Sequence, residues 1–174
     1  MVLGPGNADV AQAGGMAVRV DAGVTIGGRV FHTDPVIVPG IGAGIYTAED
    51  ALGTSWAVAV PKSGVIMSVW GYDSDDEAIE YNIILHRDDF TSGSDHDAYA
   101  PVDAEKHLWA GPPLAIDTFK GYSGVTVGGF DNVGFPYVAP KGFLYGQCVT
   151  QGTPTYASAG LLTLFFTILP DLEE

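Results

Sequence analysis

The residues of this chain best suited to holding a metal ion are four acidic side chains close together in the sequence, Asp73, Asp75, Asp76 and Glu77. Carboxylate oxygens spaced in this way are hard ligands of the kind that Ca²⁺ prefers. The segment lacks the glycine and the distant bidentate glutamate of an EF-hand loop, and an acidic cluster between two strands is usually a solvated turn. A turn is therefore the favoured interpretation of this segment, and a calcium site is the alternative.

Other side chains with chemical potential do not group into a motif. His86, His96 and His107 are too far apart in sequence to form a metal-ligand pattern, so we expect them at the surface or in an interface. Cys148 is the only cysteine, which excludes an intramolecular disulfide, and its apolar surroundings predict a buried structural thiol. The glycines of residues 40–44 lack the spacing of a dinucleotide-binding loop. We expect no enzymatic activity and no cofactor.

Charge and hydropathy limit the possible partners. Seven basic against 21 acidic residues give a formal net charge of −14, which repels phosphate backbones and anionic lipids, so neither nucleic acid nor a membrane is an expected partner. The longest apolar segment, residues 161–169, is much shorter than the roughly 20 residues of a membrane-spanning helix. Residues 1–20 lack the pattern of an export signal, so we expect a product of the cytoplasm.

The elements that position these residues are predicted to be short strands. The length of 174 residues suits one domain, and 24 glycines and 11 prolines in scattered clusters are typical of many strands joined by tight turns. Residues 1–22 are rich in Gly and Ala and are predicted to form an N-terminal arm. Residues 23–174 are predicted to form a single all-β domain, an antiparallel β-sandwich.

The final strand, residues 161–169, is apolar on both faces. Its even-numbered positions are all apolar, and the odd-numbered positions are interrupted only by Thr163 and Thr167. In a sandwich only one face of a strand meets the opposite sheet, so another structure must cover the second face. A neighbouring copy of the chain is one answer, and the chain's own long loops are the other.

Three further segments carry specific predictions. Residues 78–86 are predicted to form a half-buried strand with Tyr81 on its inner face and His86 on its mostly polar outer face. Residues 46–52 are predicted to include one helical turn, because Thr47 is followed three positions later by Asp50. In residues 121–140 only a short strand at positions 125–127 is predicted.

Several of these segments resemble small structural proteins of tailed-phage virions, the capsid decoration (cement) and minor head proteins. The resemblance rests on residues 45–53, 63–69, 80–86 and 144–158, the last running into residues 161–171. It implies a jelly-roll sandwich that associates as homotrimers on an icosahedral head, binds the major capsid protein and performs no catalysis. It places the protein on the capsid surface of the virion.

The residues expected to form the core or the subunit contacts are apolar or aromatic side chains of the last two strands: Tyr145, Leu161, Leu162, Phe165 and Phe166. Trp56, Trp70 and Trp109 are expected in the core, although exposed aromatic side chains would instead suit a glycan-binding tail-fibre or adhesin module. A cupin-type enzyme is a third hypothesis, and it requires a histidine-rich metal site that this sequence does not display.

Overall fold

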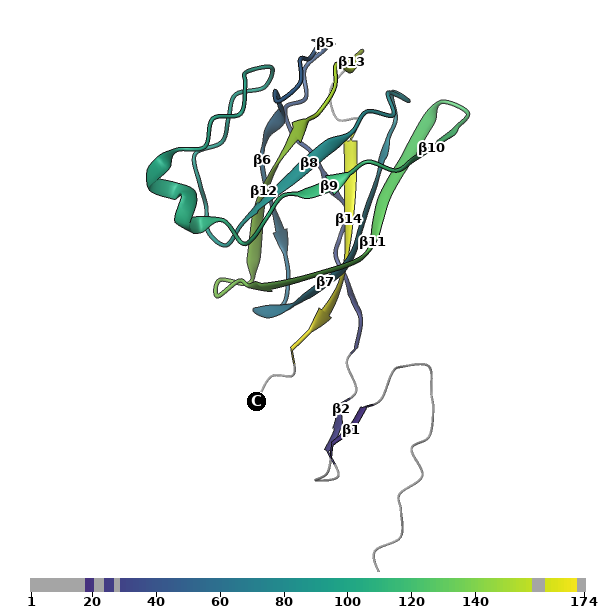
Figure 1. Cartoon of the computed structure of the whole chain (residues 1–174). Coiled ribbons are helices and arrows are strands. Elements are labelled where there is room, and N and C mark those ends of the chain that lie inside the picture. Colours follow the sequence, from purple (N-terminus) through teal and green to yellow (C-terminus); the bar gives the residue numbers. More distant parts are fainter. Residues whose placement is uncertain (1–17, 21–23, 27–28, 158–161, 172–174) are drawn as a thin grey trace, which may run out of the picture.

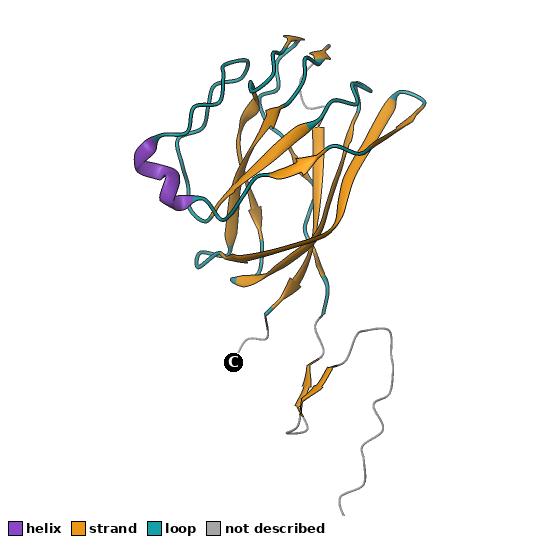
Figure 2. Cartoon of the chain, in the orientation of Figure 1, coloured by secondary structure: helices purple, strands orange, loops and turns teal. Residues whose placement is uncertain are grey.

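The fold of the computed structural model is built from antiparallel strands, which confirms the all-β prediction (Figures 1 and 2). The structure describes residues 18–20, 24–26, 29–157 and 162–171. Two sheets face each other and enclose one hydrophobic core. The protein is therefore an antiparallel β-sandwich.

The large sheet has the strand order β10-β11-β7-β14-β3, and β4 also pairs with β14. The strands of this sheet are β3 (Phe31–His32), β4 (Val36–Ile37), β7 (Ser63–Asp73), β10 (Phe119–Tyr122), β11 (Val125–Val138) and β14 (Leu162–Pro170). Every pairing is antiparallel.

The small sheet has the order β6-β12-β8-β9. Its strands are β6 (Ala51–Ala59), β8 (Tyr81–His86), β9 (Leu114–Ile116) and β12 (Phe143–Thr150). A short pair, β5 (Gly44–Ile45) with β13 (Thr155–Tyr156), closes one end of the sandwich. A separate hairpin joins β1 (Val18–Val20) to β2 (Val24–Ile26), so it lies across the predicted boundary between arm and domain at residue 22.

The core lies between the two sheets and receives alternate residues of their strands. Leu162, Leu164, Phe166 and Ile168 of β14 are all at most 2% exposed. Phe166 meets Trp56 of the small sheet across the sandwich, with ring centroids 5.9 Å apart. Burying large apolar side chains in this way is the main favourable contribution to folding.

Cys148 belongs to the same core and is fully buried, as predicted. Burial raises the pKa of its thiol to about 12. The thiol is therefore protonated and packs as a small apolar side chain.

The predicted helical turn in residues 46–52 is wrong. The Asp50 carboxylate accepts hydrogen bonds from the backbone N–H and the hydroxyl of Thr47, which forms a local turn. Strand β6 then begins at Ala51, whose N–H donates to the Asp97 carbonyl. Pairing with a distant loop decides the conformation here, and a local capping pattern does not reveal it.

The predicted strand at residues 125–127 is much longer in the structure, because β11 continues to Val138. Gly128 stands inside it, where an added Cβ would lie 2.5 Å from the ring of Phe119. The glycine makes room for an aromatic ring of the neighbouring strand β10. Glycines that suggested turns in the sequence are thus sites of close packing within a strand.

A 3₁₀ helix, η1 (Asp103–Leu108), interrupts the long connection between β8 and β9. Figure 1 shows this connection beside β6, β8 and β12. No helix in the described part of the chain has the length and apolar character needed to cross a bilayer.

Candidate functional site

The outer face of the large sheet carries the most prominent exposed apolar surface of the sandwich. Pairing between β14 and β7 places Phe165 opposite Trp70 and Thr163 opposite Tyr72 on this face. The rings of Trp70 and Phe165 stack with centroids 4.1 Å apart and an interplanar angle of 8°, and Trp70 is 41% exposed. We call Tyr72, Trp70 and Phe165 the aromatic stripe.

Further apolar side chains extend the aromatic stripe on both sides. On the β4 side, Ile37 is opposite Thr163 in the register and is 62% exposed. Beyond the stripe, Leu169 is opposite Val65 and is also exposed. Thr163 on this face is 3% exposed, but Trp70, Ile37 and Leu169 are exposed, so the described residues leave much of the second apolar face predicted for the last strand open to solvent.

The predicted contact residues separate into three groups. Leu162 and Phe166 are core residues, while Phe165 lies half-buried in the aromatic stripe. Tyr145 is half-buried on the small sheet, where the register pairs it with both Ala57 and His86. Leu161 lies outside the described residues.

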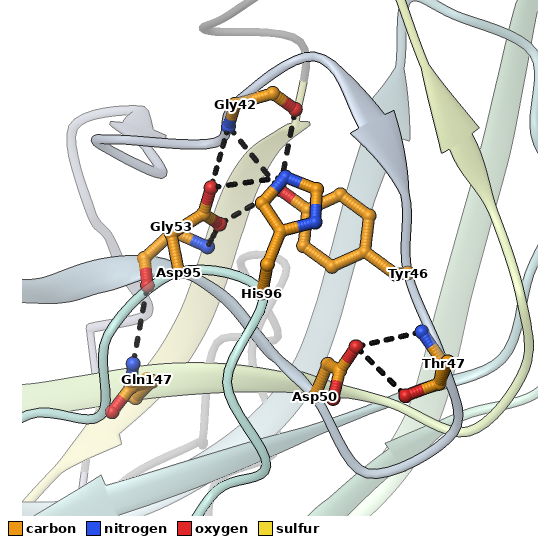
Figure 3. Close-up of polar contacts among 8 residues, drawn as sticks. All are labelled: Gly42, Tyr46, Thr47, Asp50, Gly53, Asp95, His96 and Gln147. Carbon is orange, nitrogen blue, oxygen red and sulfur yellow. Dashed lines mark hydrogen bonds and ion pairs between the residues drawn. The ribbon is translucent and has the colours of Figure 1, made fainter.

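A long loop between β8 and β9 covers the outer face of the small sheet, and Asp95 anchors it (Figure 3). The Asp95 carboxylate accepts hydrogen bonds from the Gly53 N–H at 2.6 Å, the Tyr46 hydroxyl at 2.7 Å and the Gly42 N–H at 2.8 Å. His96 stacks on the Tyr46 ring at 3.8 Å between centroids, and its Nε2 is 3.4 Å from Asp95 Oδ2. Both carboxylate oxygens are thus occupied by donors, and their role in this arrangement is to hold the loop.

The close approach of Asp95 depends on two glycines. A Cβ on Gly42 would lie 2.8 Å from Asp95 Oδ2, and a Cβ on Gly53 would lie 2.2 Å from the Pro39 carbonyl oxygen. Gly53 also has a φ of +69°, a conformation that side chains disfavour. Gln147 is fully buried and holds the same loop through the backbone of Gly93. The Gly93 N–H donates to the side-chain oxygen of Gln147, and the Gly93 carbonyl accepts a hydrogen bond from the side-chain nitrogen of Gln147.

The acidic segment between β7 and β8 is a second anchoring structure at the same end. Asp73 is 7% exposed and accepts hydrogen bonds from the Tyr156 hydroxyl and from the Asp75 N–H. Asp75 accepts from the Ala157 N–H, and Glu77 accepts from the Thr155 N–H. Burial raises the pKa of Asp73.

The segment is a turn with exposed residues at Ser74 and Asp76, as expected, but its carboxylates also bind protein donors. Asp76 accepts a hydrogen bond from the Thr126 hydroxyl, which links the segment to β11 as well. Across the described residues, no group of three His, Cys, Asp or Glu side chains is arranged to hold a metal ion. The four acidic residues instead fasten β13 and β11 to the turn after β7.

The two anchors meet through aromatic rings. Tyr46 and Tyr156 contact each other edge to face, with centroids 5.7 Å apart, and each donates its hydroxyl to an aspartate. Burial raises the pKa of both phenols well above the usual value, so both remain donors. No local sequence spacing pointed to these pairs, because their members are 49 and 83 positions apart.

His86 differs from its prediction as a surface or interface residue. It is 1% exposed, because the covering loop brings Phe90 against its ring at 3.7 Å between centroids and Trp109 against its edge at 6.2 Å. Burial lowers its pKa to about 4, against a weaker opposing effect of Glu105. His107 is exposed, as expected, and His96 is half-buried beside Asp95.

Comparison of the chain with protein-family models, with curated proteins and with solved structures finds no match.

The buried His86 predicts a loss of stability in mild acid. Its folded-state pKa lies below the value of about 6.5 for an unfolded chain, so protons bind preferentially to the unfolded state. The free energy of unfolding should therefore fall as pH falls from about 6.5 to about 4, by roughly 2–3 kcal/mol from this group. Urea unfolding of His86→Phe at several pH values should show a smaller fall in the free energy of unfolding than wild type.

His107→Phe is the control and should keep the wild-type dependence of the free energy of unfolding on pH. The same dependence in His86→Phe as in wild type would contradict the assignment.

Removing the Asp95 carboxylate should release the covering loop. Asp95→Ala removes the acceptor of the Gly53 N–H, and it leaves the Gly42 N–H and the Tyr46 hydroxyl with only the longer hydrogen bonds between Gly42 and Tyr46; an unpaired buried donor costs about 1–3 kcal/mol. We expect a free energy of unfolding about 2 kcal/mol lower and faster amide exchange in residues 93–99. Asp97→Ala, two positions away and exposed, serves as the matched control and should change stability by less than about 1 kcal/mol. Equal effects of the two substitutions would show that Asp95 is not the anchor.

Proposed function

We propose that this protein is a structural virion component, a capsid decoration or cement protein that self-associates through the aromatic stripe and stabilises a phage head by binding the major capsid protein. The observation that carries the self-association is the stacked pair of Trp70 and Phe165 on a sheet face that the described residues leave largely exposed. Exposed apolar patches rimmed by polar residues are typical of protein interaction sites. The homotrimer and the capsid partner come from the resemblance to phage head proteins.

The connection of the strands supports the jelly-roll part of this proposal. The large sheet contains the order β4-β14-β7-β11, and the small sheet has β6-β12-β8-β9. If these eight strands are numbered along the chain, the two orders are 1-8-3-6 and 2-7-4-5. Consecutive strands therefore lie in opposite sheets, except β8 and β9, which pair with each other in the small sheet. Two interleaved four-stranded sheets of this kind are the arrangement of a jelly roll.

The side-chain chemistry is consistent with a structural role. The best-formed polar clusters of the described residues, around Asp95 and Asp73, bind the chain's own backbone and hydroxyl groups. The proposal therefore assigns no catalytic residue. A decoration protein of this kind adds buried area between subunits of the shell, which stabilises the assembled state by mass action.

The self-association is tested by Phe165→Asp. Placing a carboxylate in the aromatic stripe should weaken association by roughly 100-fold or more, because burying a Phe side chain contributes about 1.5–3 kcal/mol and a buried unpaired charge is strongly unfavourable. Sedimentation velocity over a range of concentrations measures this effect. Phe130→Asp, which changes an exposed phenylalanine at another position of the large sheet, is the control and should leave association unchanged.

A Phe165→Asp protein that keeps both its fold and its wild-type oligomeric state would overturn the assignment of the aromatic stripe as an interface. Labelling of purified virions with an antibody against this chain tests the site of incorporation. Label on the head supports the proposed role, and label restricted to the tail contradicts it.

The exposed stacking of Trp70 favours one second candidate, a glycan-binding module of a tail fibre or adhesin. Trp70 is 41% exposed and flat against Phe165, so its free face is open to stacking by a sugar ring. Trp109, considered from the sequence, is less suitable, because it is half-buried against His86. Binding on a glycan array that is lost in Trp70→Ala and retained in Trp109→Phe would favour this candidate over decoration.

A further inference from the structure

The edge of the small sheet offers a second and different surface for self-association. Strand β6 is an edge strand and pairs only with β12 among the described strands. Val60 N–H donates to the Gly142 carbonyl, so Val60 and Gly142 are opposite each other as a hydrogen-bonded pair. Because hydrogen-bonded and non-hydrogen-bonded pairs alternate in an antiparallel ladder, the next pair, Ala59 with Phe143, is non-hydrogen-bonded. By alternation, the backbone N–H and C=O groups of Ala57 and Ala59 and the C=O of Ser55 point away from β12, up to the register shift that begins before Trp56.

These outward groups are free within the described chain. The beginning of β6 is occupied, because Ala51 N–H donates to the Asp97 carbonyl and Thr54 N–H donates to the Pro39 carbonyl. From Ser55 to Ala59, no described backbone or side-chain group bonds to the outward side of the strand. The free edge therefore presents a regular row of donors and acceptors, which is a template for another strand.

There is also space beside this edge. A groove of about 620 Å³ lies between β6 and the β3–β4 segment of the other sheet, lined among others by Phe31, Pro35, Ile37, Trp56, Ala57 and Ala59. Neighbouring strands in a sheet lie about 4.8 Å apart, so an added strand needs open space directly alongside the edge. The exposed side chains of this edge, Ala57 and Ala59, are small and leave that approach unobstructed.

The edge lacks the features that usually prevent strand pairing. Proteins protect edge strands with lysines, prolines or other charged residues, and none occurs in β6, although the chain has 28 charged residues in all, 7 basic and 21 acidic. Two copies of a chain with net charge −14 repel each other over most of their surfaces. An uncharged strand edge is where two copies approach with the least repulsion.

We propose that β6 pairs antiparallel with β6 of a second copy about a two-fold axis at Ala57, which joins the two small sheets into one continuous sheet. Ala57 then faces its own counterpart, and Ser55 faces Ala59 of the partner subunit. The pair at Ala57 exchanges two backbone hydrogen bonds, so the same edge supplies the donors and acceptors of both copies. The interface is self-complementary, as a two-fold contact requires.

This contact is separate from the aromatic stripe, which lies on the other sheet. The cross-strand neighbours of Ala57 and Ala59 on β12 are Tyr145 and Phe143, and Phe143 is 42% exposed. In the joined sheet, each of these aromatic side chains lies beside an alanine of β6, and the row of cross-strand neighbours continues into the second copy. It also assigns Tyr145 a place beside a subunit contact.

The test is a pair of alanine-to-lysine substitutions at the two edges of the small sheet. Ala57→Lys places two like charges opposite each other at the axis, and sedimentation velocity should show a dimer dissociation constant at least tenfold higher than wild type. Ala115→Lys adds the same charge at an exposed alanine of β9, the opposite edge strand, and should leave the dissociation constant unchanged. Circular dichroism confirms that both variants are folded.

Amide exchange provides a second readout that does not depend on a substitution. The N–H groups of Ala57 and Ala59 should exchange at least tenfold more slowly at high protein concentration than at low concentration. Amides of β9, the opposite edge strand of the small sheet, should show no concentration dependence. Either concentration-independent exchange at Ala57 or wild-type sedimentation of Ala57→Lys would overturn the inference. Both outcomes hold whatever the result for Phe165→Asp, so the β6 contact and the aromatic stripe are tested independently.

Discussion

Strand β14 is the element on which the rest of the structure depends, because the burial of its inner face holds the two sheets together. Leu164 and Phe166 on that face are almost completely buried, and Phe166 reaches Trp56 across the core. The strand pairs with β7 along its length and with β3 and β4 on the other side. Its outer face is therefore fixed in place by the packing of its inner face, and Phe165 is presented on a rigid sheet.

In the part of the chain that the structure describes, the two faces of the sandwich differ because a long loop covers the small sheet and no comparable segment covers the large one. The connection anchored by Asp95 and Gln147 lies over the small sheet and buries His86 beneath it. The large sheet has no described segment of comparable length over its outer face, and there the stacked rings of Trp70 and Phe165 remain open. This asymmetry supports a protein that uses one face for its own stability and the other for association.

The carboxylates of the buried Asp73 and the partly buried Asp95 have an energetic cost that their partners offset. Asp73 and Asp95 each accept several hydrogen bonds from backbone N–H or tyrosine hydroxyl groups, which satisfies the polar atoms that burial removes from water. Such fully bonded networks fix loops in a single arrangement. A chain with strong negative charge thus uses some of its aspartates as internal fasteners.

The sequence alone determined the all-β class, the buried thiol of Cys148 and the two apolar faces of the last strand, because these follow from composition and from a period of two residues. Tertiary structure decided which faces are covered and which polar groups meet. His86 is buried and Asp95 reaches Tyr46 only because a distant loop folds over the small sheet. Local patterns contain no information about which remote segment will complete a surface, so these contacts depend on the fold.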